Sequence, residues 1–240
     1  MSSRPFAFRD LRAEPDAAVL ERFHRDVLAP SFEPAELDPL DVIAEGLRAT
    51  GPTRTSALVA VGPSGDVLGG VVGELYEPER VLLLAYLAVR PDLRGRGIGT
   101  ALLHRAAASW YGPGVALAVG EVHDPGRWPE EGDAAAGRLR LYAQVGARLL
   151  DVPFVQPALG PGRPRIDGFL LLAFHVAADA GLGDGVPSGL LSRFVRAYYE
   201  REEGVRPPYD PELASLLELI EREPVVPLLP VDAYARVRAL

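Results

Sequence analysis

The sequence contains no cysteine, lysine or asparagine, and its single methionine is Met1. Without cysteine, the chain cannot form disulfides, use a thiol nucleophile, or hold zinc or an iron–sulfur cluster through thiolates. Without lysine, it has neither a Schiff-base lysine nor the lysine of a Walker P-loop. All 25 basic residues are therefore arginine, a skew that we attribute to a GC-rich genome rather than to function.

Basic charge and long apolar runs are also scarce. The 25 basic residues face 33 acidic ones, which gives a formal net charge of −8 at pH 7. Nucleic-acid binding needs a basic face, so this balance argues against a nucleic-acid partner and mildly favours a cationic small molecule. The longest apolar runs, residues 81–89 and 169–176, are far shorter than the roughly 20 residues that cross a bilayer. No signal segment opens the sequence, so we expect a cytoplasmic protein without membrane association.

The remaining composition is that of a globular protein, with 48% hydrophobic and 24% charged residues. Hydrophobic periodicity predicts the order β-α-α-β-β-β-α-β-α-β-β, followed by two helices. The expected strands cover about residues 5–11, 57–61, 67–76, 81–89, 115–122, 149–156 and 166–176. The expected helices cover about residues 16–28, 35–49, 98–110, 134–145, 188–203 and 210–223. A Gly-rich linker is expected at residues 180–187.

The most informative segment is a glycine-rich turn between a buried strand and a helix, Leu87-Ala-Val-Arg-Pro-Asp-Leu-Arg-Gly-Arg-Gly-Ile-Gly-Thr100. Glycines let backbone N–H groups come close to a ligand, and the start of a helix adds partial positive charge. This combination favours a bound pyrophosphate. On the glycines alone, a tight turn that only packs is the alternative. A dinucleotide-binding Rossmann fingerprint does not fit, because no acidic partner follows at the expected distance.

The segment Arg94-Gly-Arg-Gly-Ile-Gly99 resembles the Arg/Gln-x-x-Gly-x-Gly/Ala motif of the GNAT N-acetyltransferase superfamily. Further on, Arg138-Leu-Arg-Leu-Tyr142-Ala-Gln-Val-Gly146 resembles the second signature of that family, a short helix with a Tyr ahead of a Gly. The resemblance covers about residues 5–177. It implies an α/β fold with a mixed, mostly antiparallel central sheet, splayed between its fourth and fifth strands, and helices on both faces. The domain would span residues 1–178, followed by a C-terminal helical extension over 179–240.

The resemblance also implies that acetyl-CoA lies in the opening between the strands at residues 81–89 and 115–122. Backbone amides of the turn would bind the pyrophosphate, and free backbone groups at Leu87 and Val89 would pair with the pantetheine. The expected cofactor-binding residues are Leu87, Val89, Arg94, Gly95, Arg96, Gly97, Ile98, Gly99 and Thr100. Many family members contact the pantetheine through an Asn after the fifth strand, so the contacts there must differ in this chain.

Acetyl transfer to an amine involves two proton transfers, because the amine starts as an ammonium and the CoA thiolate must gain a proton. Tyr142 matches the family position of the acid, with packing of a helix-face aromatic residue as the alternative. For the base, Glu121 at the exit of the fifth strand is our first choice. Glu74, Tyr86 and His123 are the other candidates, and no metal site is expected.

The function implied by the resemblance is transfer of an acetyl group from acetyl-CoA to a primary amine by direct attack. The expected acceptor is a small-molecule or peptide amine. Its binding site would be shaped by the first two helices, the loops at residues 30–34 and 124–133, and the tail. The acidic residues of these loops that would suit a polyamine, an aminoglycoside or a basic side chain are Glu33, Glu130, Glu131 and Asp133. Solvated loop acids are the alternative. A non-catalytic acyl-CoA sensor, an acyltransferase with another acyl-CoA donor, and a homodimer formed through the tail all stay open.

Overall fold

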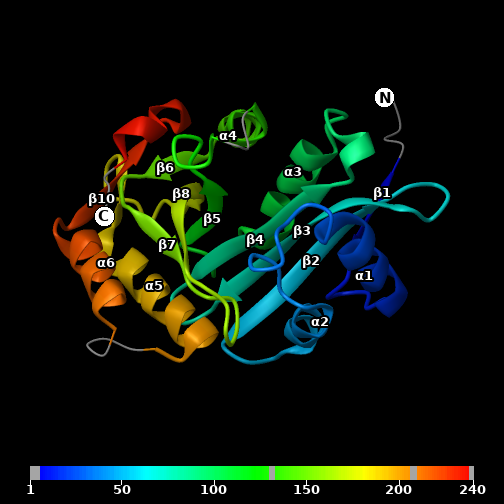
Figure 1. Cartoon of the computed structure of the whole chain (residues 1–240), viewed down its shortest axis with the longest axis horizontal. Coiled ribbons are helices and arrows are strands. Elements are labelled where there is room, and N and C mark those ends of the chain that lie inside the picture. Colours follow the sequence, from blue (N-terminus) through cyan, green and yellow to red (C-terminus); the bar gives the residue numbers. More distant parts are fainter. Residues whose placement is uncertain (1–5, 130–132, 206–209, 238–240) are drawn as a thin grey trace. The chain divides into compact units, whose positions relative to one another are not determined.

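The computed structural model describes residues 6–129, 133–205 and 210–237. These residues form two units (Figure 1). Unit 1 comprises Met1–Pro78 and Leu82–Gly112, and unit 2 comprises Glu79–Val81 and Pro113–Leu240. Each unit has its own strands and helices.

Unit 1 has a four-stranded sheet in the order β1-β2-β3-β4. Its elements are β1 (Ala7–Asp10), α1 (Ala17–Phe23), the π-helix η1 (His24–Leu28), α2 (Leu40–Arg48), β2 (Thr53–Val61), β3 (Val67–Tyr76), β4 (Val81–Val89), the 3-10 helix η2 (Pro91–Leu93) and α3 (Ile98–Trp110). β2 is antiparallel to both of its neighbours, with Phe8 opposite Ala60 and Thr53 opposite Tyr76. A tight turn at residues 62–66 joins β2 to β3.

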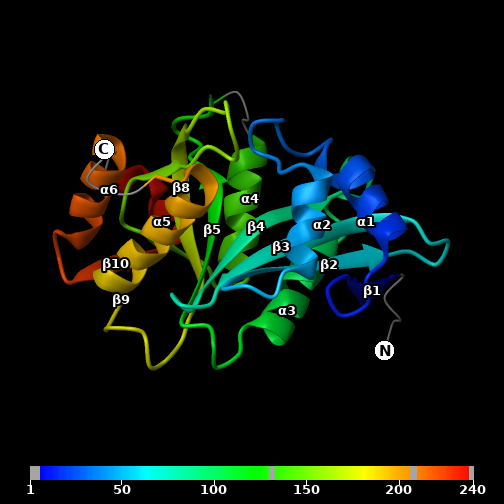
Figure 2. The same ribbon diagram turned by 90° about the horizontal axis from the view of Figure 1, so that it is seen from below.

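Helices cover both faces of this sheet (Figures 1 and 2). A Cβ built on Gly70 would lie 2.6 Å from the ring of Phe23 in α1, whereas one on Gly73 would lie 2.9 Å from the ring of Trp110 in α3. Residues three apart on a strand point to opposite faces. α1 and α3 therefore pack on opposite sides of β3, and the two glycines let their aromatic rings lie directly against the strand.

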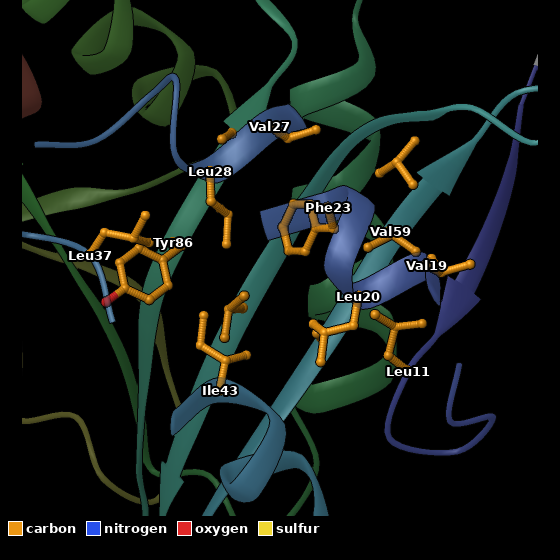
Figure 3. Close-up of a cluster of buried hydrophobic side chains, with 14 residues drawn as sticks. Leu11, Val19, Leu20, Phe23, Val27, Leu28, Leu37, Ile43, Val59 and Tyr86 are labelled. Atoms are coloured by element: carbon orange, nitrogen blue, oxygen red, sulfur yellow. The ribbon is translucent and has the colours of Figure 1, made fainter. Parts of the chain in front are cut away.

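The core of unit 1 lies between the sheet and the face of α1, η1 and α2 (Figure 3). Its side chains are Leu11, Val19, Leu20, Phe23, Val27, Leu28, Leu37, Ile43, Ala57, Val59, Val67, Val72, Tyr86 and Ala88. Arg12 secures the end of α2, because its guanidinium donates to the carbonyl oxygens of Leu47 (3.0 Å) and Ala49 (2.7 Å). A cation at the C-terminus of a helix also stabilises the helix dipole.

Unit 2 is built around the long strand β8. Its elements are β5 (Leu117–His123), α4 (Asp133–Gln144), β6 (Arg148–Leu150), β7 (Phe154–Gln156), β8 (Ile166–Val176), β9 (Gly185–Pro187), α5 (Ser188–Glu203), α6 (Pro211–Glu221), β10 (Val225–Leu229) and the 3-10 helix η4 (Val231–Arg236). β8 is antiparallel to β5, β6 and β7, and β10 joins β6 to β9. α4 lies on one side of β5 and β8, and α5 lies on the other (Figures 1 and 2).

The structure confirms the predicted fold class, a mixed α/β fold with a largely antiparallel open sheet and helices on both faces. The boundaries of β3, β4, β8, α3 and α5 coincide with those expected from the sequence. The predicted opening between the fourth and fifth strands involves β4 of unit 1 and β5 of unit 2, and it stays a prediction. The domain boundary between residues 178 and 179 stays a prediction as well.

Several local expectations differ from the structure. The single strand expected at residues 149–156 is two strands, β6 and β7, interrupted before Phe154 by a proline that has no N–H to donate. The second helix begins at Leu40 rather than near residue 35, because Pro39 precedes it and two further prolines lie upstream. The linker at residues 180–187 contains β9, which pairs with the unpredicted β10.

Candidate functional site

The glycine-rich turn lies wholly within unit 1, between the end of β4 and the start of α3. Gly95 and Gly97 have φ angles of 75° and 77°, a left-handed conformation that side chains other than glycine rarely adopt. Gly97 caps the N-terminus of α3 without a side-chain hydrogen bond. A Cβ added to either glycine would meet no atom within 4 Å. The glycines are therefore required by backbone geometry rather than by crowding, and the space beside them is open.

The first turn of α3 supplies main-chain donors for an anion. In an α-helix the first N–H groups have no acceptor within the helix, and the first regular bond of α3 runs from the N–H of Ala101 to the oxygen of Gly97 (3.0 Å). The amides of Ile98, Gly99 and Thr100 precede this bond. The side chain of Ile98 is buried and fixes the helix on the sheet. This arrangement is suited to a phosphate or pyrophosphate group.

Arginines surround the turn and are exposed. Arg94 and Arg96 are both on the surface, and Arg94 Nε donates to the carbonyl oxygen of Val89 (3.4 Å). Arg90 is engaged elsewhere, in an ion pair with Asp92 (2.8 Å). All nine cofactor-binding residues expected from the sequence thus lie on one continuous stretch of unit 1, at the end of β4, in the turn and in the first turn of α3.

Tyr142, the predicted acid, lies on α4 in unit 2. Its ring packs edge-to-face on Phe174, with 5.1 Å between the ring centroids. Burial raises the pKa of its hydroxyl above the ordinary value, although Arg138, one turn earlier on the helix, partly offsets this. The phenol therefore keeps its proton at neutral pH, as an acid must before it donates.

The Tyr-to-Gly spacing of the second signature has a structural reason at the end of α4. Gly146 has a φ of 85°, and the N–H of Ala147 donates to the carbonyl oxygen of Tyr142 (3.0 Å). Such a left-handed glycine ends a helix and satisfies its last carbonyl groups. The signature therefore fixes where the helix stops after Tyr142.

Glu121, the predicted base, lies on β5 opposite Leu171 of β8. Its Oε2 accepts a hydrogen bond of 2.5 Å from Nε2 of Gln156 on β7. Burial raises the pKa of the Tyr199 hydroxyl on α5, and the negative charge of Glu121 raises it further. Glu121 therefore faces α5, whereas Tyr142 lies on α4, on the other side of the sheet (Figures 1 and 2). The two residues are not brought together within unit 2.

The remaining candidates for the base are packed in the interior. His123 is buried and stacks on Trp128 at 4.2 Å and against Phe169 at 4.6 Å. In unit 1, Glu74 is buried on β3, and Tyr86 is buried on β4. These surroundings are those of core residues, and the hydroxyl of Tyr86 donates to Oδ2 of Asp38 (3.1 Å).

The sequence did not reveal a charged cluster, the Arg165 cluster, that fastens α5 and α6 to the segment before β8. Arg165 pairs with Glu203 (2.5 Å) on α5, with Asp210 at the start of α6 and with Glu212 (2.7 Å). Its guanidinium also lies 4.9 Å from the centre of the Tyr199 ring. Neither this cluster nor the partner of Glu121 has a local sequence signal, because each joins residues at least 35 positions apart.

The predicted acceptor-side acids are only partly within the structure. Glu33 is exposed in the segment between η1 and α2. Glu130 and Glu131 lie outside the described residues, as does the side chain of Asp133. Among the residues that the structure does describe, no group of three or more His, Asp or Glu side chains could hold a metal ion. No helix within these same residues has the length and apolar character of a membrane span.

Residues 54–146 match the family model of the acetyltransferase (GNAT) domain, and this range contains both the turn and the Tyr142 helix. The matched range is less than half of the chain. The matched range extends from β2 to Gly146 at the end of α4. The resemblance that the two sequence signatures indicated is thereby confirmed.

Solved structures similar to this chain agree with that fold. A GNAT-family acetyltransferase from Bacteroides thetaiotaomicron is 20% identical, with a TM-score of 0.56 over 72% of this chain and 89% of its own. Spermidine N-acetyltransferase from Vibrio cholerae is 15% identical, with a TM-score of 0.50 over 70% of this chain and 92% of its own. At this level of identity the similarity shows the fold. Comparison with curated proteins gave no match to this sequence.

Proposed function

We propose that this GNAT domain transfers an acetyl group from acetyl-CoA to the primary amine of a small molecule or a peptide. The observation that carries the proposal is the turn before α3, where two left-handed glycines leave open space beside the first main-chain amides of the helix, which have no acceptor within the helix. The pyrophosphate of CoA is an anion of the kind that such a helix start binds. Arg94 and Arg96 add positive charge at the rim of the turn.

In the proposed reaction, the amine nitrogen attacks the thioester carbonyl carbon, a C–N bond forms and the C–S bond breaks. An alkylammonium with a pKa of about 10 must first lose a proton, and the nitrogen loses a second one when the amide forms. Main-chain groups at Leu87 and Val89 hold the pantetheine, and an amide donor there stabilises the oxyanion, by about 3 kcal/mol in comparable sites. Tyr142 protonates the departing thiolate.

Glu121 is the base in this proposal, and its hydrogen bond to Gln156 fixes the orientation of the carboxylate. Direct attack involves two proton transfers at different atoms: the base takes a proton from the amine nitrogen, and the acid gives one to the thiolate sulfur. The carboxylate of Glu121 can therefore face away from the Tyr142 helix. The acidic net charge of −8 supports a cationic acceptor. We therefore expect the preferred acceptor to be an amine with more than one positive charge.

The proposal is tested by two measurements on the purified full chain. Calorimetry should detect CoA binding, and a thiol-release assay with acetyl-CoA should find an amine that is acetylated. Tyr142→Phe and Glu121→Gln should each lower kcat by about 100-fold and leave the CoA affinity unchanged. Tyr234→Phe, a change of the same kind in η4, is the matched control and should keep full activity.

Three outcomes would contradict the proposal in different ways. If millimolar CoA produces neither heat nor a shift in melting temperature, the turn does not bind the cofactor and the transferase assignment fails. If CoA binds but no amine releases thiol, the domain is an acyl-CoA sensor. If thiol is released only from longer acyl-CoA donors, the fold performs acyl transfer and the acetyl donor is wrong.

A further inference from the structure

A buried amide in unit 2 holds the carboxylate that is proposed as the base. Nε2 of Gln156, the last residue of β7, donates to Oε2 of Glu121 over 2.5 Å, and Gln156 is only 6% exposed. Within the part of the chain that the structure describes, no donor reaches the other polar atom of this amide, Oε1. A buried polar atom without a partner is unfavourable for folding. Stability alone therefore favours an apolar residue at this position, and what the amide supplies is an N–H for Glu121.

Helix α5 holds the main chain on both sides of Gln156 (Figure 1). The hydroxyl of Tyr199 donates to the carbonyl oxygen of Val155 (2.7 Å). The backbone N–H of Ala158 donates to Oε1 of Glu203 (2.7 Å). Tyr199 and Glu203 are four residues apart, so they lie on the same face of the helix. The helix thus fixes the residue before the amide and the second residue after it.

The sheet alone defines the position of β7 poorly. The strand has three residues, and its register against β8 shifts between Phe154 and Gln156. An irregular register of this kind disrupts the ladder of hydrogen bonds. Arg165, the residue before β8, pairs with Glu203 (2.5 Å) and so ties α5 to the strand that pairs with β7. The direction in which the Gln156 amide points therefore depends on α5 as well as on β8.

The hydroxyl of Tyr199 remains a donor near neutral pH. Tyr199 is fully buried, and burial raises the pKa of its hydroxyl. The charges of Glu203 and Glu121 raise this pKa further, whereas the charge of Arg165 opposes the rise. A hydrogen bond from which water is excluded is also stronger than one in water. The bond from Tyr199 to the main chain of β7 therefore persists across the neutral pH range.

Gln156 and α5 lie beyond residues 54–146, the range that matches the family model. We infer that α5, through Tyr199 and Glu203, positions Gln156 so that its amide orients the carboxylate of Glu121 for taking a proton from the amine. The inference rests on the proposed acetyl transfer. One proton passes from the amine nitrogen to the carboxylate, and an N–H donated to that carboxylate favours the ionised form that accepts it. Gln156, Tyr199 and Glu203 are thus positioning residues for the base.

The first test is Gln156→Met, which keeps the length of the buried side chain and removes the amide. We expect kcat to fall about tenfold, with KM for acetyl-CoA and the calorimetric Kd for CoA within about twofold of the wild type. The acid limb of the kcat/KM profile should move up by about one pH unit, because the carboxylate has lost an N–H donor. In the Glu121→Gln background, Gln156→Met should cause no further loss of kcat, since no carboxylate remains to be oriented.

The second test is Tyr199→Phe, which keeps the ring on α5 and removes the hydroxyl. We expect a smaller fall in kcat, about threefold, because Glu203 still holds Ala158, together with a shift of the acid limb in the same direction. Amide hydrogen exchange should increase within residues 154–158. Tyr198→Phe is the matched control, since Tyr198 is the preceding residue, is 3% exposed and stacks on Phe194 (5.7 Å). This variant should keep the wild-type kcat and pH profile.

Three results would overturn the inference. A Gln156→Met variant with the wild-type kcat and pH profile would show that the amide does not orient the base. A loss of kcat as large in the Glu121→Gln background as in the wild type would show that Gln156 only stabilises the fold. Equal effects of Tyr198→Phe and Tyr199→Phe would show a general loosening of α5.

The proposed function fails through different results. A wild-type chain that acetylates no amine would overturn the transfer itself, and the inference with it. Full activity of Glu121→Gln alone would show that another group is the base, and Gln156 would then have no base to position.

Discussion

The glycine-rich turn of unit 1 and the Arg165 cluster of unit 2 handle charge in opposite ways. The turn has main-chain N–H groups at the start of a helix and exposed arginines beside them, and we propose that they bind an anion. In the cluster, the Arg165 side chain is 18% exposed and meets the carboxylates of Glu203 (11%) and Asp210 (15%) from its own chain. Main-chain N–H groups at the start of a helix remain available to a ligand. Oppositely charged side chains of the same chain instead pair with one another and stabilise the fold.

The same contrast explains how much could be predicted from the sequence. The turn depends on φ angles, and glycines at positions 95 and 97 mark those angles in the sequence itself. A nine-residue apolar strand before it and a regular helix after it made both neighbours recognisable. Tyr142 was singled out by the resemblance of residues 138–146 to the second family signature, and Gly146 ends its helix as a left-handed glycine. Local rules therefore predicted the position of the glycine-rich turn and of the end of the Tyr142 helix.

Residues that meet only through the tertiary fold could not be predicted. Arg165 follows a Gly/Pro-rich turn, and nothing near it marks Glu203 or Asp210 as partners. Gln156 was expected as the last residue of a longer strand, and nothing near it in the sequence marks Glu121 as its hydrogen-bond partner. The strands β9 and β10 are three and five residues long, too short for alternation to stand out. Helix propensity and periodicity carry no information about which elements dock together.

The largest effect should come from Arg165→Ala. Removing the guanidinium leaves the carboxylates of Glu203 and Asp210 buried without their cation, which typically destabilises a protein by about 3 kcal/mol. The free energy of unfolding, measured by urea denaturation, should fall by that amount. Arg127→Ala is the matched control, because its ion pair with Asp167 has side chains 52% and 64% exposed and should contribute less than about 1 kcal/mol. Equal losses in the two variants would mean that the cluster is no more important than a surface ion pair.

A smaller effect, on binding, is expected from Gly97→Ala. The left-handed conformation costs a residue with a Cβ roughly 1–2 kcal/mol, so the turn should relax and misdirect its amides, raising the Kd for CoA about tenfold. Gly65→Ala, in the turn between β2 and β3, is the control. Its φ of 87° is similarly left-handed, and a Cβ there also meets nothing within 4 Å. Both variants should lose similar stability in thermal unfolding, but only Gly97→Ala should lose CoA affinity in calorimetry. A Gly97→Ala variant with wild-type Kd would refute the main-chain site.

The smallest effect concerns pH and Asp210. The hydrogen bond from Arg165 holds the pKa of this carboxyl below its ordinary value, with the backbone N–H of Leu213 adding to the effect. A carboxyl whose pKa is lowered by folding stabilises the protein above its unfolded pKa of about 3.9, and this stabilisation is lost as the pH falls through the folded pKa. In Asp210→Asn, the amide oxygen can still cap α6 through Leu213, so the change removes the charge and keeps the cap.

The variant should therefore be less stable than the wild type at pH 7, by no more than about 1 kcal/mol, and the difference should shrink as the pH falls below about 4. Urea denaturation across that acid range measures it directly. The decisive control is to repeat the series in the Arg165→Ala background, where the pH-dependent difference should disappear because the cation that lowers the pKa is gone. If the difference persists there, the hydrogen bond from the Leu213 N–H lowers the pKa of Asp210, and the charge of Arg165 is not the cause.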